Sequence, residues 1–278
     1  QIGAVIRRAE LYHTNEFFEI AKRIVRSGSI KIVMLAGPSS SGKTTSSHRL
    51  TVQLMVNGIK AIPIALDDYF VNRDRTPIGE DGKPDFESLY AVDLELFNTQ
   101  LKQLLAGEEV ELPIFDFKTG MRKISGRKIK LEENQVLIFE GIHALNEELT
   151  RDIPRENKFK MYISALTSIN IDDHNSVSTS DSRLLRRMVR DNRTRGYSPS
   201  KTLTVWSEVR DGEEKYVFPL QDSADVMFNT SLAYELAVLK SYAEPLLFTI
   251  SSDDPEYETA KRLLSLLNNI LPIPSESV

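Results

Sequence analysis

The sequence predicts an α/β fold in three layers, with helices on both faces of a mostly parallel central sheet. Short apolar runs at 32–36, 61–66 and 135–139 and a further predicted strand at 158–163 alternate with longer segments. Such runs are typical of parallel strands that are buried on both faces. Several of them end in glycine or in a carboxylate, and ligands of open α/β sheets bind at the carboxyl ends of strands. We therefore expect a binding site along that edge.

The first apolar run leads into a glycine-rich segment, Gly37-Pro-Ser-Ser-Ser-Gly42-Lys43-Thr44-Thr45, and a helical pattern follows to about residue 56. Glycines let successive backbone N–H groups turn inward around an anion, and the helix start adds its positive dipole end. Lys43 can reach terminal phosphates, and the Thr44 hydroxyl can ligate Mg²⁺. The segment predicts a P-loop NTPase fold that binds ATP and Mg²⁺. Its nucleotide-binding residues are Gly37, Pro38, Ser39, Ser40, Ser41, Gly42, Lys43, Thr44 and Thr45.

Composition narrows the class of protein. The chain has 278 residues, no cysteine and a net charge of −5. It therefore has no disulfide or thiolate chemistry, and its net charge favours neither nucleic acid nor an anionic membrane as a partner. No apolar run approaches membrane-spanning length, so we expect a cytoplasmic enzyme. The chain begins at Gln1, which suggests a piece of a longer protein.

The domain organisation follows the order of these patterns. Residues 1–28 are expected to form a helix, with apolar periodicity at 4–25, that packs at the edge of the core or links to a missing upstream region. Residues 29–278 form the P-loop domain. Its further predicted elements are a helix at 45–56, a polar loop at 72–85, a helix at 94–105, a β-hairpin insertion from 110–117 and 122–131, an irregular segment at 166–182, strands at 224–228 and 246–250, helices at 182–195, 232–242 and 253–270, and a loose tail after 272.

Two carboxylates mark the expected binding edge. Asp67 follows the apolar run 61–66, and Glu140 follows the run 135–139. An apolar strand that ends in a carboxylate is typical of a metal-associated motif in this fold. Alternate residues that leave a strand point to opposite faces, so Asp67 is expected to face the site, while Asp68 either faces it as well or caps a turn. His174 is interpreted as a surface or capping residue.

Arginines crowd the predicted helix at 182–195, and they have no obvious internal partners. They are Arg183, Arg186, Arg187, Arg190, Arg193 and Arg195. Like charges at helical spacing repel one another, whereas arginine binds phosphate oxygens in a bidentate manner. The pattern favours phosphate recognition over a solvated basic face.

These motifs together resemble the uridine kinase and phosphoribulokinase family. The resemblance rests on the glycine loop, Leu66-Asp-Asp-Tyr-Phe70, Pro113-Ile-Phe-Asp-Phe117, Phe139-Glu-Gly-Ile142 and the arginine segment from 183 to Gly196, in that order over most of residues 30–250. The sequence is most similar to bacterial uridine-kinase-like nucleoside kinases with a threonyl-tRNA-synthetase-like region upstream. That resemblance would account for the missing start.

The resemblance implies ATP-dependent transfer of the γ-phosphoryl group to a sugar hydroxyl. It implies Asp67 as the group that accepts the hydroxyl proton, with Lys43, Arg187 and Arg190 as further catalytic residues. It also implies Thr44, Asp67 and Glu140 at the metal, and a mobile arginine-rich lid at about 165–197. The implied substrate contacts are Asp67, Tyr69, Phe70, Phe86, Glu87, Phe115, Arg122 and Arg195.

One departure leaves the acceptor open. Pyrimidine nucleoside kinases of this family carry a histidine shortly after a Tyr-Asp-Phe motif, but here the motif begins with Phe115 and continues Asp116-Phe-Lys-Thr-Gly120. The acceptor is a nucleoside, or it is another sugar or sugar phosphate. A regulatory ATP-binding module with slow hydrolysis is a further alternative. A homo-oligomer and an upstream domain are both compatible with the sequence.

Overall fold

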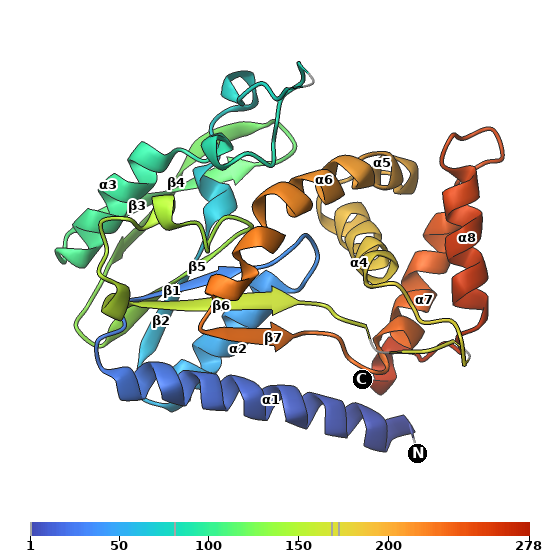
Figure 1. Cartoon of the computed structure of the whole chain (residues 1–278), viewed down its shortest axis with the longest axis horizontal. Helices are drawn as coiled ribbons and strands as arrows, with labels where there is room; N and C mark the ends of the chain where they lie inside the picture. Colours follow the sequence, from blue (N-terminus) through green and yellow to red (C-terminus); the bar gives the residue numbers. More distant parts are fainter. Residues whose placement is uncertain (1, 81, 168, 172) are drawn as a thin grey trace.

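The computed structural model describes residues 2–80, 82–167, 169–171 and 173–278. The predicted three-layer α/β architecture is confirmed, with a central sheet between helices (Figure 1). Residue 81 of the predicted polar loop and residues 168 and 172 of the predicted irregular segment lie outside the described residues, as does Gln1.

The central sheet has the strand order β2-β5-β1-β6-β7, and every neighbouring pair is parallel. Its strands are β1 (Ile32–Ala36), β2 (Lys60–Ala65), β5 (Gln135–Glu140), β6 (Lys158–Ser164) and β7 (Val226–Asn229). The five residues of β1 are all buried, as their apolar run predicts. The seven residues of β6 are buried as well, including Lys158 and Lys160.

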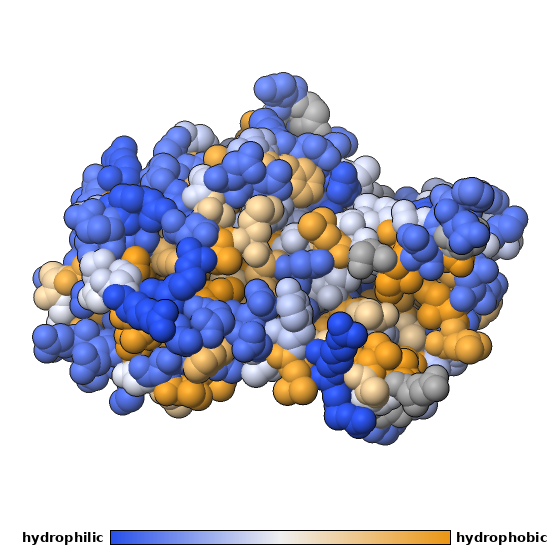
Figure 2. All heavy atoms as spheres, turned by 60° about the horizontal axis from the view of Figure 1, so that its bottom comes forward, coloured by the Kyte–Doolittle hydropathy of each residue, from blue (hydrophilic) through white to orange (hydrophobic). Residues whose placement is uncertain are grey.

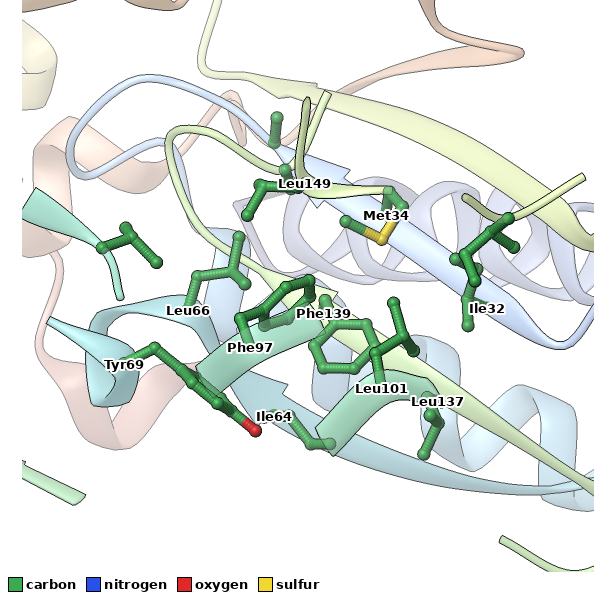
Figure 3. Close-up of a cluster of buried hydrophobic side chains, with 14 of the residues drawn as sticks. Ile32, Met34, Ile64, Leu66, Tyr69, Phe97, Leu101, Leu137, Phe139 and Leu149 are labelled. Carbon is green, nitrogen blue, oxygen red and sulfur yellow. The ribbon is translucent and has the colours of Figure 1, made fainter. Parts of the chain in front are cut away.

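Helices cover both faces of this sheet. On one face, α1 (Ile2–Ser27) and α2 (Lys43–Val56) pack against the sheet through residues that include Phe17, Leu50 and Val33. On the other face, α3 (Leu94–Leu105) contributes Phe97 and Leu101 to a cluster with Met34 and Phe139 (Figure 3). The N-terminal helix is therefore part of the domain's packing, because its buried stripe completes one side of the core.

The predicted hairpin insertion is confirmed. Strands β3 (Glu109–Asp116) and β4 (Met121–Lys130) form a separate antiparallel pair. Gly120 takes a positive φ of 69° in the turn that joins them. Asp68 accepts a hydrogen bond from the backbone N–H of Phe115 at 3.1 Å, which ties the hairpin to the end of β2.

A helical unit, α4 to α8, lies at the carboxyl end of the sheet (Figure 1). Its members are α4 (Thr179–Thr194), α5 (Pro199–Thr204), α6 (Trp206–Tyr216), α7 (Glu235–Leu247) and α8 (Tyr257–Asn268). They share an apolar cluster of their own, separate from the two clusters at the sheet. Helices α5 and α6 were not predicted. Short 3-10 helices connect the elements, at Leu66–Tyr69, Arg73–Arg75, Leu89–Ala91, Glu147–Leu149, Arg155–Asn157, Phe218–Ser223 and Ser275–Ser277.

The predicted strand at 246–250 is wrong. Leu246 and Leu247 complete α7, and Ile250 follows it in a turn. A short apolar run cannot by its periodicity be distinguished from the end of a buried helix. Here Leu247 and Ile250 pack into the apolar cluster of the helical unit, and this packing decides the conformation even though Pro245 lies within the helix.

The face that carries α1 is mixed in polarity, with apolar patches between hydrophilic side chains (Figure 2). The exposed apolar residues of α1 are Ile2, Val5, Leu11 and Tyr12. No helix within the described residues is both long enough and apolar enough to cross a membrane.

Candidate active site

The glycine loop connects β1 to α2 at the carboxyl edge of the sheet. Ser40 and Gly42 both adopt left-handed backbone angles, with φ of 57° and 93°. Gly37 has no room for a side chain, because a Cβ there would lie 2.1 Å from the carbonyl oxygen of Ile163. Helix α2 begins at Lys43, two residues earlier than predicted, so Lys43 and Thr44 belong to its first turn. The loop therefore has the strained, closely packed geometry of a phosphate-binding turn.

Lys43 reaches back over the loop. Its ammonium group donates hydrogen bonds to the carbonyl oxygens of Gly37 at 2.9 Å and Pro38 at 3.1 Å. Burial lowers the pKa of Lys43, while the carboxylates of Glu140 and Asp67 oppose that shift. A cation thus lies at the centre of the loop, held between its carbonyls and two acidic side chains.

Glu140 lies next to the start of α2. Glu140 is paired with Leu35 of β1 and with Ala65 of β2 in the sheet. It therefore lies at the carboxyl ends of both neighbouring strands. Its carboxylate accepts a hydrogen bond from the Thr44 hydroxyl at 2.6 Å. Burial raises the pKa of Glu140, Lys43 lowers it, and Asp67 raises it further.

These residues fit a magnesium nucleotide. Thr44, Asp67 and Glu140 offer only oxygen donors, which Mg²⁺ prefers, and Mg²⁺ usually takes its other ligands from phosphates and water. Within the described ranges, no group of three or more His, Cys, Asp or Glu residues could hold a metal without such help. The buried hydroxyls of Ser40 and Ser41 have no hydrogen-bond partner among the described residues. Both are donors that a phosphate oxygen would satisfy.

Asp67 and Asp68 have different surroundings, although they are adjacent. Asp67 lies close enough to Lys43, Glu140 and Glu87 to affect the pKa of each. Asp68 instead holds the hairpin at Phe115, and burial raises its pKa. Asp67 thus belongs to the site, and Asp68 supports the element beside it.

Glu87 is a second acidic group on this side of the loop. Burial raises its pKa to about 7, Arg187 opposes the shift, and Asp67 and Glu213 add to it. Helix α6 approaches closely because Gly212 has no side chain: a Cβ there would lie 2.6 Å from the Cβ of Glu87. Glu87 is therefore enclosed between the helical unit and the carboxyl edge of the sheet.

Three aromatic rings line the approach from the hairpin. Phe115 packs edge-on against Phe70, with ring centroids 5.7 Å apart, and against Phe117 at 5.3 Å. The guanidinium of Arg195 lies over the Phe117 ring at 4.4 Å. An open depression of about 450 Å³ is lined by the end of β3, Lys118, Lys123 and the end of α4 with Arg195. The structure thus brings Phe70, Phe115 and Arg195 to one side of the site.

The structure describes the surroundings of three further predicted substrate residues. Tyr69 is buried in the core beside Phe97, and its hydroxyl donates to the Gln100 side chain at 2.8 Å. Phe86 is 49% exposed. Arg122 forms an ion pair with Asp93 at 2.7 Å, and Asp93 caps the start of α3. The packing of the core and the start of α3 accounts for Tyr69 and Arg122 without a ligand.

The expectation that the arginines of α4 lack internal partners is wrong. Arg183 forms a bidentate ion pair with Glu213 of α6, at 2.5 and 2.7 Å. Arg186 pairs with Glu235 of α7. Both carboxylates lie far along the sequence, so the helical spacing of the arginines gave no sign of them.

The remaining site arginines share one carboxylate. Asp191, which is fully buried, is paired with Arg187 at 3.2 Å, Arg190 at 2.7 Å and Arg195 at 3.7 Å. Burial lowers the pKa of both Arg187 and Arg190. Three cations around one anion leave an excess of positive charge, which an anionic ligand can compensate.

Sequence reasoning missed Asp191, Glu213 and His143. His143 is buried against the Tyr216 ring at 5.8 Å, and burial lowers its pKa to about 4. Asp191 lies within the arginine segment, and its spacing of four residues from both Arg187 and Arg195 was a usable signal. Glu213 had no local signal. His174, by contrast, is exposed, as predicted.

Comparison with known proteins agrees with this geometry. The sequence profile of the Phosphoribulokinase / Uridine kinase family matches residues 32–236. A uridine kinase from Lactobacillus johnsonii is 30% identical over 197 residues, covering 70% of this chain and 84% of that protein. A uridine kinase from Halobacterium salinarum is 29% identical over 233 residues, covering 81% and 94%.

Solved structures support the fold. A putative fructose transport system kinase from Silicibacter aligns with a TM-score of 0.54 at 18% identity, covering 76% of this chain and 98% of that one. A possible uridine kinase from Bacillus stearothermophilus aligns with a TM-score of 0.51 at 22% identity, covering 79% and 100%. The match of the family profile extends from β1 into α7 and includes the loop, both acidic strand ends and the arginine helix. The chain belongs to the phosphoribulokinase and uridine kinase family of kinases.

Proposed function

We propose that this protein transfers the γ-phosphoryl group of ATP, with Mg²⁺, to a hydroxyl group of a uridine- or cytidine-like nucleoside. The family supports a phosphotransferase, and the relatives called uridine kinases support a nucleoside as acceptor. The observation that carries the proposal is the position of Asp67, which interacts with Lys43, Glu140 and Glu87 at once. A carboxylate between the phosphate loop and the acceptor side is where a hydroxyl proton must be accepted.

The nucleotide side uses the residues of the loop. The backbone of Gly37–Thr45 and the Lys43 ammonium hold the phosphates, and Thr44, Asp67 and Glu140 would hold the metal. Held by these residues, Mg²⁺ would supply positive charge that offsets the negative charge of the phosphates during transfer. Because both carboxylates lie close to Lys43, the charge of the lysine is balanced before the nucleotide binds.

The acceptor side uses Asp67, Glu87 and the aromatic rings. Asp67 orients the attacking hydroxyl and accepts its proton. Glu87 is placed to accept hydrogen bonds from neighbouring sugar hydroxyls, while Phe70 and Phe115 provide a flat apolar wall. Arg187 and Arg190 stabilise negative charge on the transferring group and, with Arg195, help to exclude water that would otherwise hydrolyse ATP.

There are two alternatives to this proposal: a kinase with another acceptor, and a protein that binds ATP for regulation. Another sugar or sugar phosphate would suit the cationic depression beside Lys118, Lys123 and Arg195. A regulatory ATP-binding module with slow hydrolysis would need no acceptor. The threonyl-tRNA-synthetase-like upstream region finds no support in the matched relatives, and the cytoplasmic location and a homo-oligomer remain predictions.

A panel assay separates these functions. ADP release is measured with ATP, Mg²⁺ and one of uridine, cytidine, adenosine, fructose or ribulose 5-phosphate, and the product is identified by mass spectrometry. We expect uridine or cytidine to accelerate ADP release and to gain one phosphate. Acceleration by a sugar or sugar phosphate alone would contradict the nucleoside assignment. Slow release that no acceptor changes would favour the regulatory module.

A further inference from the structure

The carbonyl groups of the phosphate loop are bound by side chains, in part from elements outside the loop. Every carbonyl group from Gly37 to Ser41 accepts a side-chain hydrogen bond. The donors are Lys43 for Gly37 and Pro38, Arg183 for Ser39, Arg186 for Ser40 and Thr230 for Ser41. The carbonyls of Ser39, Ser40 and Ser41 are thus fixed in direction by side chains from outside the loop.

Ser39 is the residue held most completely. Its backbone N–H donates to the Glu213 carboxylate at 2.7 Å, and its carbonyl accepts from Arg183 at 3.0 Å. Its hydroxyl is bonded to Arg187 at 2.5 Å. Three contacts from α4 and α6 thus fix one residue of the loop. We call Arg183, Arg187 and Glu213, together with Ser39, the Ser39 anchor.

Glu213 is the centre of this anchor. It bonds Ser39 and Arg183 through the same carboxylate, and Glu213 and Arg183 side chains are each only 1% exposed. Desolvating two charges is costly, so such a pair contributes little net stability compared with apolar residues of the same size. The pair does, however, fix the orientation of both side chains, because its two hydrogen bonds are parallel and bidentate.

We propose that Glu213 is a positioning residue of the nucleotide site, one that sets the conformation of the phosphate loop through Ser39 and couples it to helices α4 and α6. The inference rests on the proposed nucleotide site and adds to it a residue 174 positions from the loop. Glu213 contacts the loop through the Ser39 N–H, and we therefore assign it an indirect effect on the nucleotide.

The same geometry provides an internal probe. Trp206, the only tryptophan in the chain, lies over the Arg183 guanidinium at 5.3 Å. A change in the loop that moves Ser39 changes the surroundings of Arg183 and so the environment of the indole. Nucleotide binding is therefore expected to alter tryptophan fluorescence, and the coupling through Glu213 is expected to be needed for that change.

The test compares MgADP binding by calorimetry and by Trp206 fluorescence in the wild type, Glu213→Gln and Glu214→Gln. Glu214 is the matched control, because it neighbours Glu213 on α6 and is 62% exposed. We expect Glu213→Gln to bind MgADP about tenfold or more weakly, as loss of a buried charged hydrogen bond implies, and to lose the fluorescence response. Glu214→Gln is expected to match the wild type.

A double variant, Arg183→Gln with Glu213→Gln, covers the case in which the single change unfolds the protein. It removes both buried charges, so no charge is left uncompensated, and we expect it to fold and still to bind MgADP weakly. Affinity and fluorescence response within twofold of the wild type, in whichever of the two variants is folded, would overturn the proposal. MgADP binding needs no acceptor, so an error in the acceptor leaves this test intact. A wild type that fails to bind MgADP would overturn both the inference and the proposed function.

Discussion

Glu140 accepts a hydrogen bond of 2.6 Å from the Thr44 hydroxyl, although the two residues lie 96 positions apart in the sequence. The contact joins the end of β5 to the first turn of α2. It exists because adjacent parallel strands deliver their carboxyl ends to one edge, where β1 and β5 are directly paired. The pair brings a hydroxyl and a carboxylate together beside the phosphate loop.

The first prediction concerns this loop. Lys43→Ala and Thr44→Ala are each expected to reduce phosphoryl transfer by about a hundredfold or more, because each removes a group that stabilises charge during transfer. Neither side chain belongs to an apolar cluster, so circular dichroism and the melting temperature are expected to change little. Thr51→Ala, further along α2, is the control. Unchanged turnover of either loop variant at saturating ATP would refute the nucleotide-site assignment.

The second prediction concerns the arginine helix. Arg183 and Arg186 each pair with a carboxylate of another helix, Glu213 and Glu235, whereas Arg187, Arg190 and Arg195 share the carboxylate of Asp191 on their own helix. We expect amide hydrogen exchange to be slow at 182–187 with or without nucleotide, and to slow at 188–197 when MgATP binds. Equal exchange at 188–197 in both states would show that these arginines form a static surface.

The third prediction concerns Glu87, whose pKa burial raises to about 7 from 4.5. Because the folded state keeps a proton that the unfolded state releases, Glu87 makes the folding free energy less favourable as pH rises from about 4.5 to about 7. Glu87→Gln has no such dependence. Chemical denaturation at pH 5 and pH 8 is expected to show that the stability of the wild type relative to this variant falls as pH rises. If the difference in free energy of unfolding between the wild type and the variant is the same at both pH values, Glu87 is solvated.

Much of the fold could be predicted because its signals are local. Apolar runs predicted most strands of the sheet, and the glycine turn at Gly120 predicted the hairpin. The run at 246–250 failed because packing against α8, which the sequence does not display, determined its conformation. Helices α5 and α6 were missed because α5 has only six residues and α6 is mostly polar.

Some residues of the candidate site also had a local signal in the sequence, and others did not. Lys43, Asp67 and Glu140 could be predicted because each directly follows an apolar strand or lies in the loop between strand and helix. Glu213 could not be, since its role comes from contacts with Arg183 and Ser39 that only the tertiary fold creates. Tyr69 and Arg122 were placed at the substrate by resemblance, whereas the structure gives each a partner within the protein.

The most direct test compares Asp67→Asn with Asp68→Asn. For each variant, single-turnover transfer of the γ-phosphoryl group to the acceptor is measured beside the affinity for ATP. Asn keeps the size of Asp but does not accept a proton, and general-base assistance is worth about a hundred- to ten-thousandfold in rate. We expect Asp67→Asn to lose activity within that range, with ATP affinity affected far less, and Asp68→Asn to be milder because Asp68 only holds Phe115. Greater damage from Asp68→Asn, or no effect of Asp67→Asn, would contradict the assignment of Asp67 as the group that receives the hydroxyl proton.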